Sequence, residues 1–260
     1  MKMIRPLGTR GLTLFLATAL GVSVGLASPA FAQNVSPTSV IVNPDGKVTY
    51  LGTLGGSTES RAINDSGQVA GFSYTTGGNA HAFITGPGGM GMTDLGTLSG
   101  SIRAYGSRAH GINDSGQAVG QSDSTMGAAH AFITGPDGTG MTDLGTLTRD
   151  GFASVARGIN DSGQVVGVST KFATFEGERE QYAFITGPNG MGMTGLDSFA
   201  DLPDGAYLSD AWGINNQGQV VASAGLILEP ASYALMLAGL GLVGFMARRK
   251  KHWQAGFANR

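Results

Sequence analysis

The chain has 260 residues, of which 44 are glycine and only 13% are charged. Such a composition is unusual for a soluble enzyme and typical of short strands joined by tight turns, because glycine adopts positive φ angles without steric cost. Hydrophobic residues make up 41% of the chain, which is enough apolar surface for a folded core and argues against disorder.

The net charge of -2 hides a segregation along the chain. Basic residues gather at the two ends, whereas residues 33–225 hold 17 acidic residues against 8 basic ones, a difference of -9. An acidic body repels phosphate backbones, so nucleic acid is not expected as a partner. The absence of cysteine excludes disulfides, thiolate nucleophiles and thiolate metal sites.

The first 32 residues have the pattern of a secretory signal peptide. Three basic residues stand in the first ten positions: Lys2, Arg5 and Arg10. An apolar stretch over residues 11–26 follows, and Ala30 and Ala32 frame a small-x-small cleavage site before Gln33. A membrane anchor is the alternative, but the short apolar stretch favours an apolar signal helix that is removed. We therefore expect the mature chain to begin at Gln33, with residues 33–38 as a linker.

The body, residues 39–225, repeats itself. The block Ile-Asn-Asp-Ser-Gly-Gln starts at Ile63, Ile112 and Ile159, and a worn copy, Ile-Asn-Asn-Gln-Gly-Gln, starts at Ile214. Two further blocks recur with it, Ala-Phe-Ile-Thr-Gly-Pro and Met-Thr-Asp-Leu-Gly-Thr-Leu. The Ile-Asn blocks are spaced by 49, 47 and 55 residues. That period is typical of a propeller blade or a similar array unit.

These blocks resemble the extracellular HAF repeat, named for His-Ala-Phe. His81-Ala82-Phe83 and His130-Ala131-Phe132 match the name, while Tyr182 departs from it in the third unit. The resemblance covers most of residues 40–223. It implies an extracellular repeat domain and does not supply a biochemical activity.

Turn chemistry divides each unit into four short strands. The first strand ends in Ile-Asn, and Asn-Asp-Ser-Gly then offers Asn at the first and Gly at the last position of a tight β-turn. The second strand begins at Gln-Val or Gln-Ala. The third is His-Ala-Phe-Ile, closed by Gly-Pro-x-Gly, and the fourth is Met-Thr-Asp-Leu-Gly-Thr-Leu. Four strands in about 48 residues make one blade-sized antiparallel sheet.

The two ends of the array are half-units. Residues 39–54 align with a third and fourth strand, and residues 211–223 align with a first and second strand. Pairing of the halves would close a ring and remove free sheet edges. We therefore expect an all-β fold, a four-bladed antiparallel β-propeller flanked by the signal helix and a C-terminal transmembrane helix. A β-solenoid or a sandwich is the alternative.

One set of equivalent positions varies between units. Two residues before each repeat isoleucine stand Arg61, His110, Arg157 and Trp212. Their neighbours are small, as expected where first strands approach closely near a ring axis. The set is a candidate for facing a ligand, and packing or solvent exposure is the alternative.

Other polar residues that recur are better explained by structure than by chemistry. His81 and His130 invite a metal site, but Tyr182 replaces them in the third unit. Asp65, Asp114 and Asp161 could bind Ca²⁺, yet Asn216 replaces the acid in the last copy, so turn formation is favoured. The charged insertion over residues 171–181 could bind a partner or be solvated. We expect no catalytic residue, metal site or cofactor.

The C-terminus combines three features. Leu228-Glu229-Pro230 precedes an uncharged run over residues 231–247, which is just long enough to cross a bilayer as a helix. Four basic residues follow at once, as expected on the cytoplasmic side: Arg248, Arg249, Lys250 and Lys251.

This tail, residues 226–252, resembles the PEP-CTERM sorting signal. Glu229 and Pro230 match its motif, and Leu228 stands where the first proline usually does. The resemblance implies that the partner is an exosortase, a membrane transpeptidase-like protease acting near the motif. An ordinary transmembrane anchor is the alternative, and residues 253–260 form a short end segment.

Together these features predict a non-enzymatic protein of the surface or extracellular matrix of a Gram-negative bacterium. Its tail would hold it in the inner membrane until an exosortase processes it, and extracellular polysaccharide is a further partner. The alternative is a carbohydrate-binding module or polysaccharide hydrolase on a propeller scaffold, which requires exposed aromatic residues and a close carboxylate pair.

Overall fold

The structure is a computed structural model that describes residues 38–100, 106–148, 151–172 and 179–226, together with the single positions 238, 240 and 242. The chain divides into two units, Met1–Val35 and Ser36–Arg260, and all the described residues belong to the second. The signal peptide and its cleavage site, and the residues Glu229, Pro230 and 248–251 of the tail, lie outside the described residues. Within the described part, no helix has the length and apolarity needed to cross a membrane.

Three complete four-stranded antiparallel sheets form the body. Sheet 1 consists of β3 (Gly55–Ile63), β4 (Val69–Thr75), β5 (Ala80–Thr85) and β6 (Met92–Asp94). Sheet 2 consists of β7 (Ser107–Ile112), β8 (Ala118–Asp123), β9 (Ala129–Thr134) and β10 (Met141–Gly145). Sheet 3 consists of β11 (Gly151–Ile159), β12 (Val165–Phe172), β13 (Arg179–Thr186) and β14 (Met193–Gly195).

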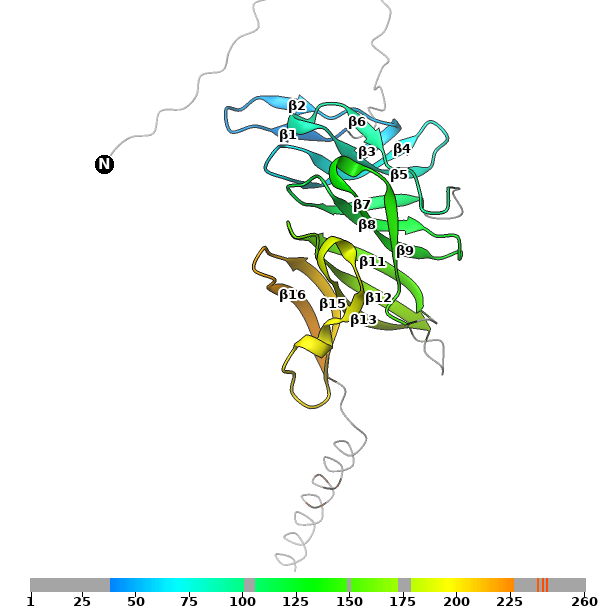
Figure 1. Cartoon of the computed structure of the whole chain (residues 1–260), viewed down its shortest axis with the longest axis vertical. Coiled ribbons are helices and arrows are strands. Elements are labelled where there is room, and N and C mark those ends of the chain that lie inside the picture. The colour runs from blue at the N-terminus through cyan, green and yellow to red at the C-terminus, as the bar shows by residue number, and fades with distance from the viewer. Residues whose placement is uncertain are drawn as a thin grey trace, which may run out of the picture. The chain divides into compact units, whose positions relative to one another are not determined.

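Two-stranded antiparallel sheets stand at either end of the row (Figure 1). The N-terminal pair consists of β1 (Val40–Val42) and β2 (Val48–Tyr50). The C-terminal pair consists of β15 (Ala206–Ile214) and β16 (Val220–Leu226). Short 3-10 helices follow the third strands at η1 (Pro87–Gly89), η2 (Pro136–Gly138) and η3 (Pro188–Gly190), and η4 (Leu196–Phe199) precedes β15.

The predicted division of each unit into four strands is confirmed. Each first strand ends at the repeat isoleucine, and the Asn-x-x-Gly turn that follows is closed in sheet 2 by a hydrogen bond of 3.0 Å from Gly116 N to Asn113 O. Gly116 has φ +72°, a conformation that glycine adopts without strain. Each Gly-Pro-x-Gly segment then docks on that turn, as Gly138 N does by donating to Gly116 O.

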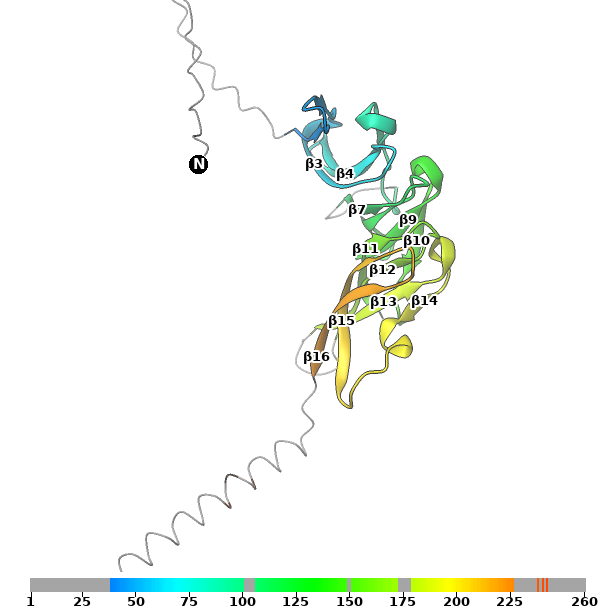
Figure 2. The same cartoon turned by 90° about the vertical axis from the view of Figure 1, so that its left-hand side faces the viewer.

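The sheets stack face to face, and the core lies between them (Figure 2). The first strand of each sheet packs on the second and third strands of the sheet before it: β7 on β4 and β5, β11 on β8 and β9, and β15 on β12 and β13. One apolar cluster fills each interface, centred on the fully buried rings of Phe83, Phe132 and Phe184 and on Val166. No sheet can therefore bury its apolar face alone.

The expected closure into a propeller is not found. Among the described strands, β1 pairs with β2 and β15 pairs with β16, and neither half-unit pairs with the other. The half-units were correctly predicted, but the ring was inferred from the expectation that these two halves pair with each other within one chain. Closure depends on the rotation from one sheet to the next, which the packing between sheets sets and the period of the sequence does not encode.

Candidate functional site

Each first strand carries a β-bulge near its end, and the bulged residue is one of the four candidates. The register shifts between Ser60 and Ala62 in β3, and at the equivalent places in β7, β11 and β15. The residues passed over by the pairing are Arg61, His110, Arg157 and Trp212. A bulge re-aims the side chain of the extra residue, so all four are displaced from the ladder in the same way. We call this set the bulge row.

Small residues allow the close backbone contacts around each bulge. A Cβ atom built on Gly120 of β8 would lie 1.9 Å from Arg108 O on β7, and the same glycine recurs in β4 and β12. After the bulge, a Cβ atom on Gly111 would lie 3.3 Å from Arg157 O of the next first strand. The predicted close approach of the first strands is thus confirmed. It brings the bulge row together along adjacent strands.

Arg157 and Trp212 are adjacent members of the bulge row that contact each other. The Arg157 guanidinium donates to Asp210 through Nε at 2.9 Å and Nη2 at 2.7 Å, a bidentate arrangement. Its Cζ atom lies 4.1 Å from the centroid of the Trp212 ring, within cation–π range. Trp212 Nε1 donates to Ser223 Oγ at 3.0 Å, which orients the indole. Trp212 stays 51% exposed and so presents an oriented ring to solvent.

At the other end of the row, two guanidinium groups share one aromatic ring. Arg61 Cζ lies 5.6 Å and Arg108 Cζ 5.1 Å from the centroid of the Phe72 ring on β4. Arg61 also pairs with Glu59 at 2.6 Å. Sequence reasoning missed Arg108, Phe72 and Asp210 because they stand at positions that vary between units and carry no shared pattern.

His110 is held neutral within the row. Burial lowers the pKa of His110 to about 4, and the nearby charges of Arg61, Arg157 and Arg108 contribute to the same shift. Its Nε2 atom is buried without a hydrogen-bond partner among the described residues. A neutral imidazole between guanidinium groups avoids adding a further like charge at pH 7.

The bulge row offers hydrogen-bond donors and an oriented aromatic ring. Two neighbouring carboxylates contact the row, Glu59 through Arg61 and Asp210 through Arg157. No described cluster of three or more His, Asp or Glu residues could hold a metal ion. The guanidinium groups and the exposed indole of the row are groups that can form hydrogen bonds and stacking contacts.

His81 and His130 are partners of a neighbouring strand in their own sheets. His81 Nδ1 lies 2.8 Å from an Asp94 carboxylate oxygen, and His130 Nδ1 lies 2.9 Å from Asp143. Burial raises the pKa of Asp143, but hydrogen bonds from His130 and the Gly145 amide and the charge of His130 outweigh it and lower that pKa. The metal interpretation therefore gains no support.

A coupled change in the third unit shows that these histidines act in pairs. Histidine and aspartate stand 13 residues apart in the first two units. In the third unit Tyr182 and Gly195 occupy the same two places, so both partners are replaced together. This common spacing was available in the sequence and could have identified the pairs.

The turn aspartates, a candidate Ca²⁺ set, join successive turns instead. Asp65 N donates to Asp114 Oδ1 at 3.0 Å, Asp114 N donates to Asp161 Oδ1 at 3.0 Å, and Asp161 N donates to Asn216 Oδ1 at 2.9 Å. Asparagine side chains run parallel to them, with Asn113 Nδ2 donating to Asn160 O at 3.1 Å. We call these contacts the turn ladder. It explains why both residue types recur and why asparagine can replace the last acid.

The charged insertion and the remaining candidates are only partly within the described residues. Lys171 Nζ lies 5.2 Å from the Tyr182 ring centroid, at the base of the insertion. Residues 173–178 lie outside the described part, as do the cleavage-site residues Ala30, Ala32 and Gln33. Two residues separate the end of β16 at Leu226 from Glu229.

Comparison with known families identifies the tail. Residues 229–250 match the PEP-CTERM protein-sorting motif. The match begins at Glu229 and ends within the basic cluster, so Leu228 lies just before it. No curated protein matches the chain.

A PEP-CTERM motif is recognised by an exosortase, which is a membrane protein. The motif therefore implies that the chain is exported toward the cell surface and sorted by that enzyme. The sorting motif begins at residue 229, shortly after the last strand ends at Leu226. The row of sheets is therefore the part of the chain that the motif sorts.

Proposed function

We propose that this chain is a non-enzymatic protein of the cell surface or extracellular matrix, processed by an exosortase through its sorting motif. The match of residues 229–250 carries the proposal. It is supported by the signal-peptide pattern of residues 1–32 and by the uncharged run over residues 231–247, which would hold the chain in the inner membrane until processing. The histidine and aspartate side chains of the repeats serve contacts within and between sheets.

Intact mass and cell fractionation, with and without an active exosortase, test this proposal. A mature form that starts near Gln33 and lacks the residues after about Pro230 is expected only when the exosortase is present. A Glu229→Ala variant should remain unprocessed, and Leu228→Pro, which restores the usual first proline, should be processed at least as completely. An uncleaved tail in both strains would overturn the proposal and leave a plain membrane anchor.

A second candidate function is binding of extracellular polysaccharide through the bulge row. The half-exposed Trp212 ring, oriented by Arg157 and Ser223, favours it, because an oriented aromatic ring beside hydrogen-bond donors suits the apolar face and hydroxyls of a sugar. Binding is favoured over cleavage because the observation behind this candidate is an exposed, oriented ring.

Retention on polysaccharide isolated from the producing cells tests this second function. Trp212→Ala should reduce retention at least tenfold, since it removes the stacking ring. Tyr50→Ala, which removes an aromatic residue that is 73% exposed on β2, is the matched control and should bind normally. Equal retention of both variants and the unaltered protein would exclude the bulge row as the site.

A further inference from the structure

The two ends of the row are complementary halves of one sheet. In each complete sheet the strand order along the chain is first, second, third and fourth. The N-terminal pair has the turn and the Asn-Pro-Asp-Gly sequence that place it as a third and fourth strand. The C-terminal pair carries the bulge and turn of a first and second strand. Each half therefore lacks the strands that the other half has.

On the free edge of β1, side chains are exposed at positions that are buried in the complete sheets. Val40 occupies the place of Phe83, Phe132 and Phe184, which are each 0% exposed, yet Val40 is 40% exposed. Val42, two residues on, is 68% exposed. A hydrophobic strand edge of this kind is a template for pairing with another strand.

The free edge of β16 shows the same contrast. Val221 occupies the place of Val119 and Val166, which are each 0% exposed, but Val221 is 63% exposed. Leu226, at the end of the strand, is 68% exposed. In complete sheets the third strand covers this edge.

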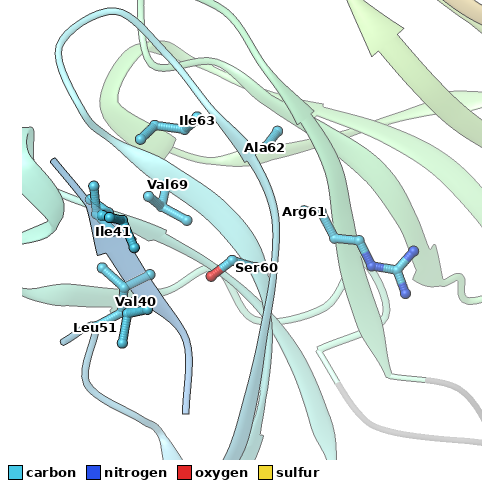
Figure 3. A pocket seen from close by; sticks show the side chains of 9 residues that line it. Val40, Ile41, Leu51, Ser60, Arg61, Ala62, Ile63 and Val69 are labelled. Atoms are coloured by element: carbon cyan, nitrogen blue, oxygen red, sulfur yellow. The ribbon is translucent and has the colours of Figure 1, made fainter. Parts of the chain in front are cut away.

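A cavity marks where a second strand is missing at the N-terminal end. It has a volume of about 340 Å³ and lies between β1 and β3 (Figure 3). Its apolar lining includes Val40, Ile41 and Val69, and Arg61 points away from it (Figure 3). Elsewhere a first strand packs on both the second and the third strand of the preceding sheet. Among the described strands, β3 has only β1, the third strand, beneath it, with Ser39 Oγ accepting a hydrogen bond from Ser60 N.

We propose that β16 of one chain pairs antiparallel with β1 of a second copy and completes a four-stranded sheet. The partner is a second copy because three complete sheets stand between β1 and β16 of the same chain (Figure 1). The turn ladder and the apolar clusters hold each step between those sheets, so one chain cannot bring its ends together without breaking them.

The complete sheets supply the register of this pairing. In sheet 2, Val119 lies opposite Ile133 and Gly120 lies opposite Phe132. The equivalent pairs between copies are Val221 with Ile41 and Ala222 with Val40.

The sizes of these residues fit the proposed register. In sheet 3 a Cβ atom added to Gly167 would lie 3.0 Å from Phe184 Cε1, so a larger residue on the second strand needs a smaller partner on the third. Both residues differ at the two ends of the chain. Ala222 stands where the second strand otherwise has glycine, and Val40 stands where the third strand otherwise has phenylalanine. Volume-conserving exchanges of this kind keep a core well packed.

When identical chains pair through two different surfaces, the assembly grows without limit unless the rotation between copies closes it into a ring. The mature protein would then assemble head to tail, with each junction continuing the row of sheets. This inference does not depend on the sorting proposal, because it concerns the two ends of the folded repeats.

Cysteine cross-linking of the full chain in mild detergent tests the pairing, because the native sequence has no cysteine. Val40→Cys and Ala222→Cys are made as separate single variants, distinguished by mass, mixed and oxidised. A disulfide between the two variants should form at least tenfold more than in a mixture of Val40→Cys with Ser223→Cys. That control shifts the register by one residue and turns the thiol to the opposite face.

The double variant Val40→Cys/Ala222→Cys separates the two ways of pairing. Head-to-tail association should produce a series of covalent oligomers on a non-reducing gel. A monomer with an internal disulfide would mean that one chain closes on itself, and would overturn the proposal. Cross-linking of the mixture no stronger than in the shifted control would overturn it as well.

Two substitutions test the edge without cysteine. Val221→Lys places a charge on the edge of β16 and should weaken concentration-dependent association at least tenfold in sedimentation. Val42→Thr should strengthen it, because the equivalent Thr134 Oγ1 accepts a 2.8 Å hydrogen bond from Ala118 N on the second strand. Association unchanged by both substitutions would show that this edge is not the contact.

Discussion

His110 stands among the arginine side chains of the bulge row with its pKa lowered to about 4, first by burial and then by Arg61, Arg157 and Arg108. In the unfolded chain the histidine pKa is near its ordinary value of about 6.5. Because the folded pKa is the lower one, the unfolded state binds more protons between these two values. Stability is therefore complete above about pH 6.5 and decreases as the pH falls toward 4.

The predicted result is a loss of about 2 kcal/mol in the free energy of unfolding between pH 7.5 and pH 5, attributable to His110. Urea unfolding of the unaltered protein and of His110→Asn at both pH values measures it. The variant should lose about 2 kcal/mol less than the unaltered protein over that range. Equal losses in both proteins would show that His110 is not buried as the structure places it.

At the level of strands, the free energy of unfolding should be most sensitive to the close approach of the first and second strands before each bulge. Gly120→Ala places a methyl group 1.9 Å from Arg108 O. Alanine occupies the equivalent position at Ala222, but there the first strand has a further register shift between Leu208 and Asp210, which β7 lacks. We expect a loss of about 3 kcal/mol in the free energy of unfolding. Gly195→Ala in β14 is the control, since no heavy atom lies within 4 Å of its added Cβ, and it should change stability by less than about 0.5 kcal/mol. A similar loss in both variants would contradict the packing described.

The turns carry a second prediction at the level of elements. Asn113 makes the hydrogen bonds of its own turn and also donates to Asn160 O, whereas Asn215, in the last turn, makes only those of its own turn. Asn113→Ala should therefore cost about 2–3 kcal/mol in the free energy of unfolding and Asn215→Ala about 1 kcal/mol. Chemical denaturation compares them. An equal effect of the two substitutions would mean that the turn ladder contributes nothing between sheets.

At the level of the whole molecule, each sheet contacts only its neighbours, as in other repeat arrays. Removing residues 107–153 deletes one full unit and joins Gly106 to Ser154, which is equivalent to Ser107. The shorter chain should fold with the same type of interface, because Ala156 and Val165 replace Ala109 and Ala118 against sheet 1.

Circular dichroism and sedimentation check that prediction. Strand content per residue should be unchanged, and concentration-dependent association should persist, because both free edges remain. A closed ring would not survive the loss of one unit. Loss of folding in the shortened chain would therefore support closure within one chain, and folding without association would contradict the pairing of β16 with β1.

Most of the local structure was predictable from the sequence because it depends on neighbouring residues. The Asn-x-x-Gly turns, the four strands of each unit and the two half-units follow from turn chemistry and from the period of the repeats. The bulge row was recognisable as a set because its members hold equivalent positions beside small residues. The residues that contact the bulge row were not predictable, because Asp210 lies 53 residues from Arg157 and belongs to the next unit.

The sequence by itself determined the all-β repeat architecture and the sorting motif, because each depends on short segments of chain. Only the tertiary structure decided that Arg61, His110, Arg157 and Trp212 are bulged, and that the turn aspartates join successive sheets. It also decided that the half-units stay apart within one chain. These properties depend on the rotation and packing between sheets, which sum many contacts across distant segments and leave no pattern in the order of residues.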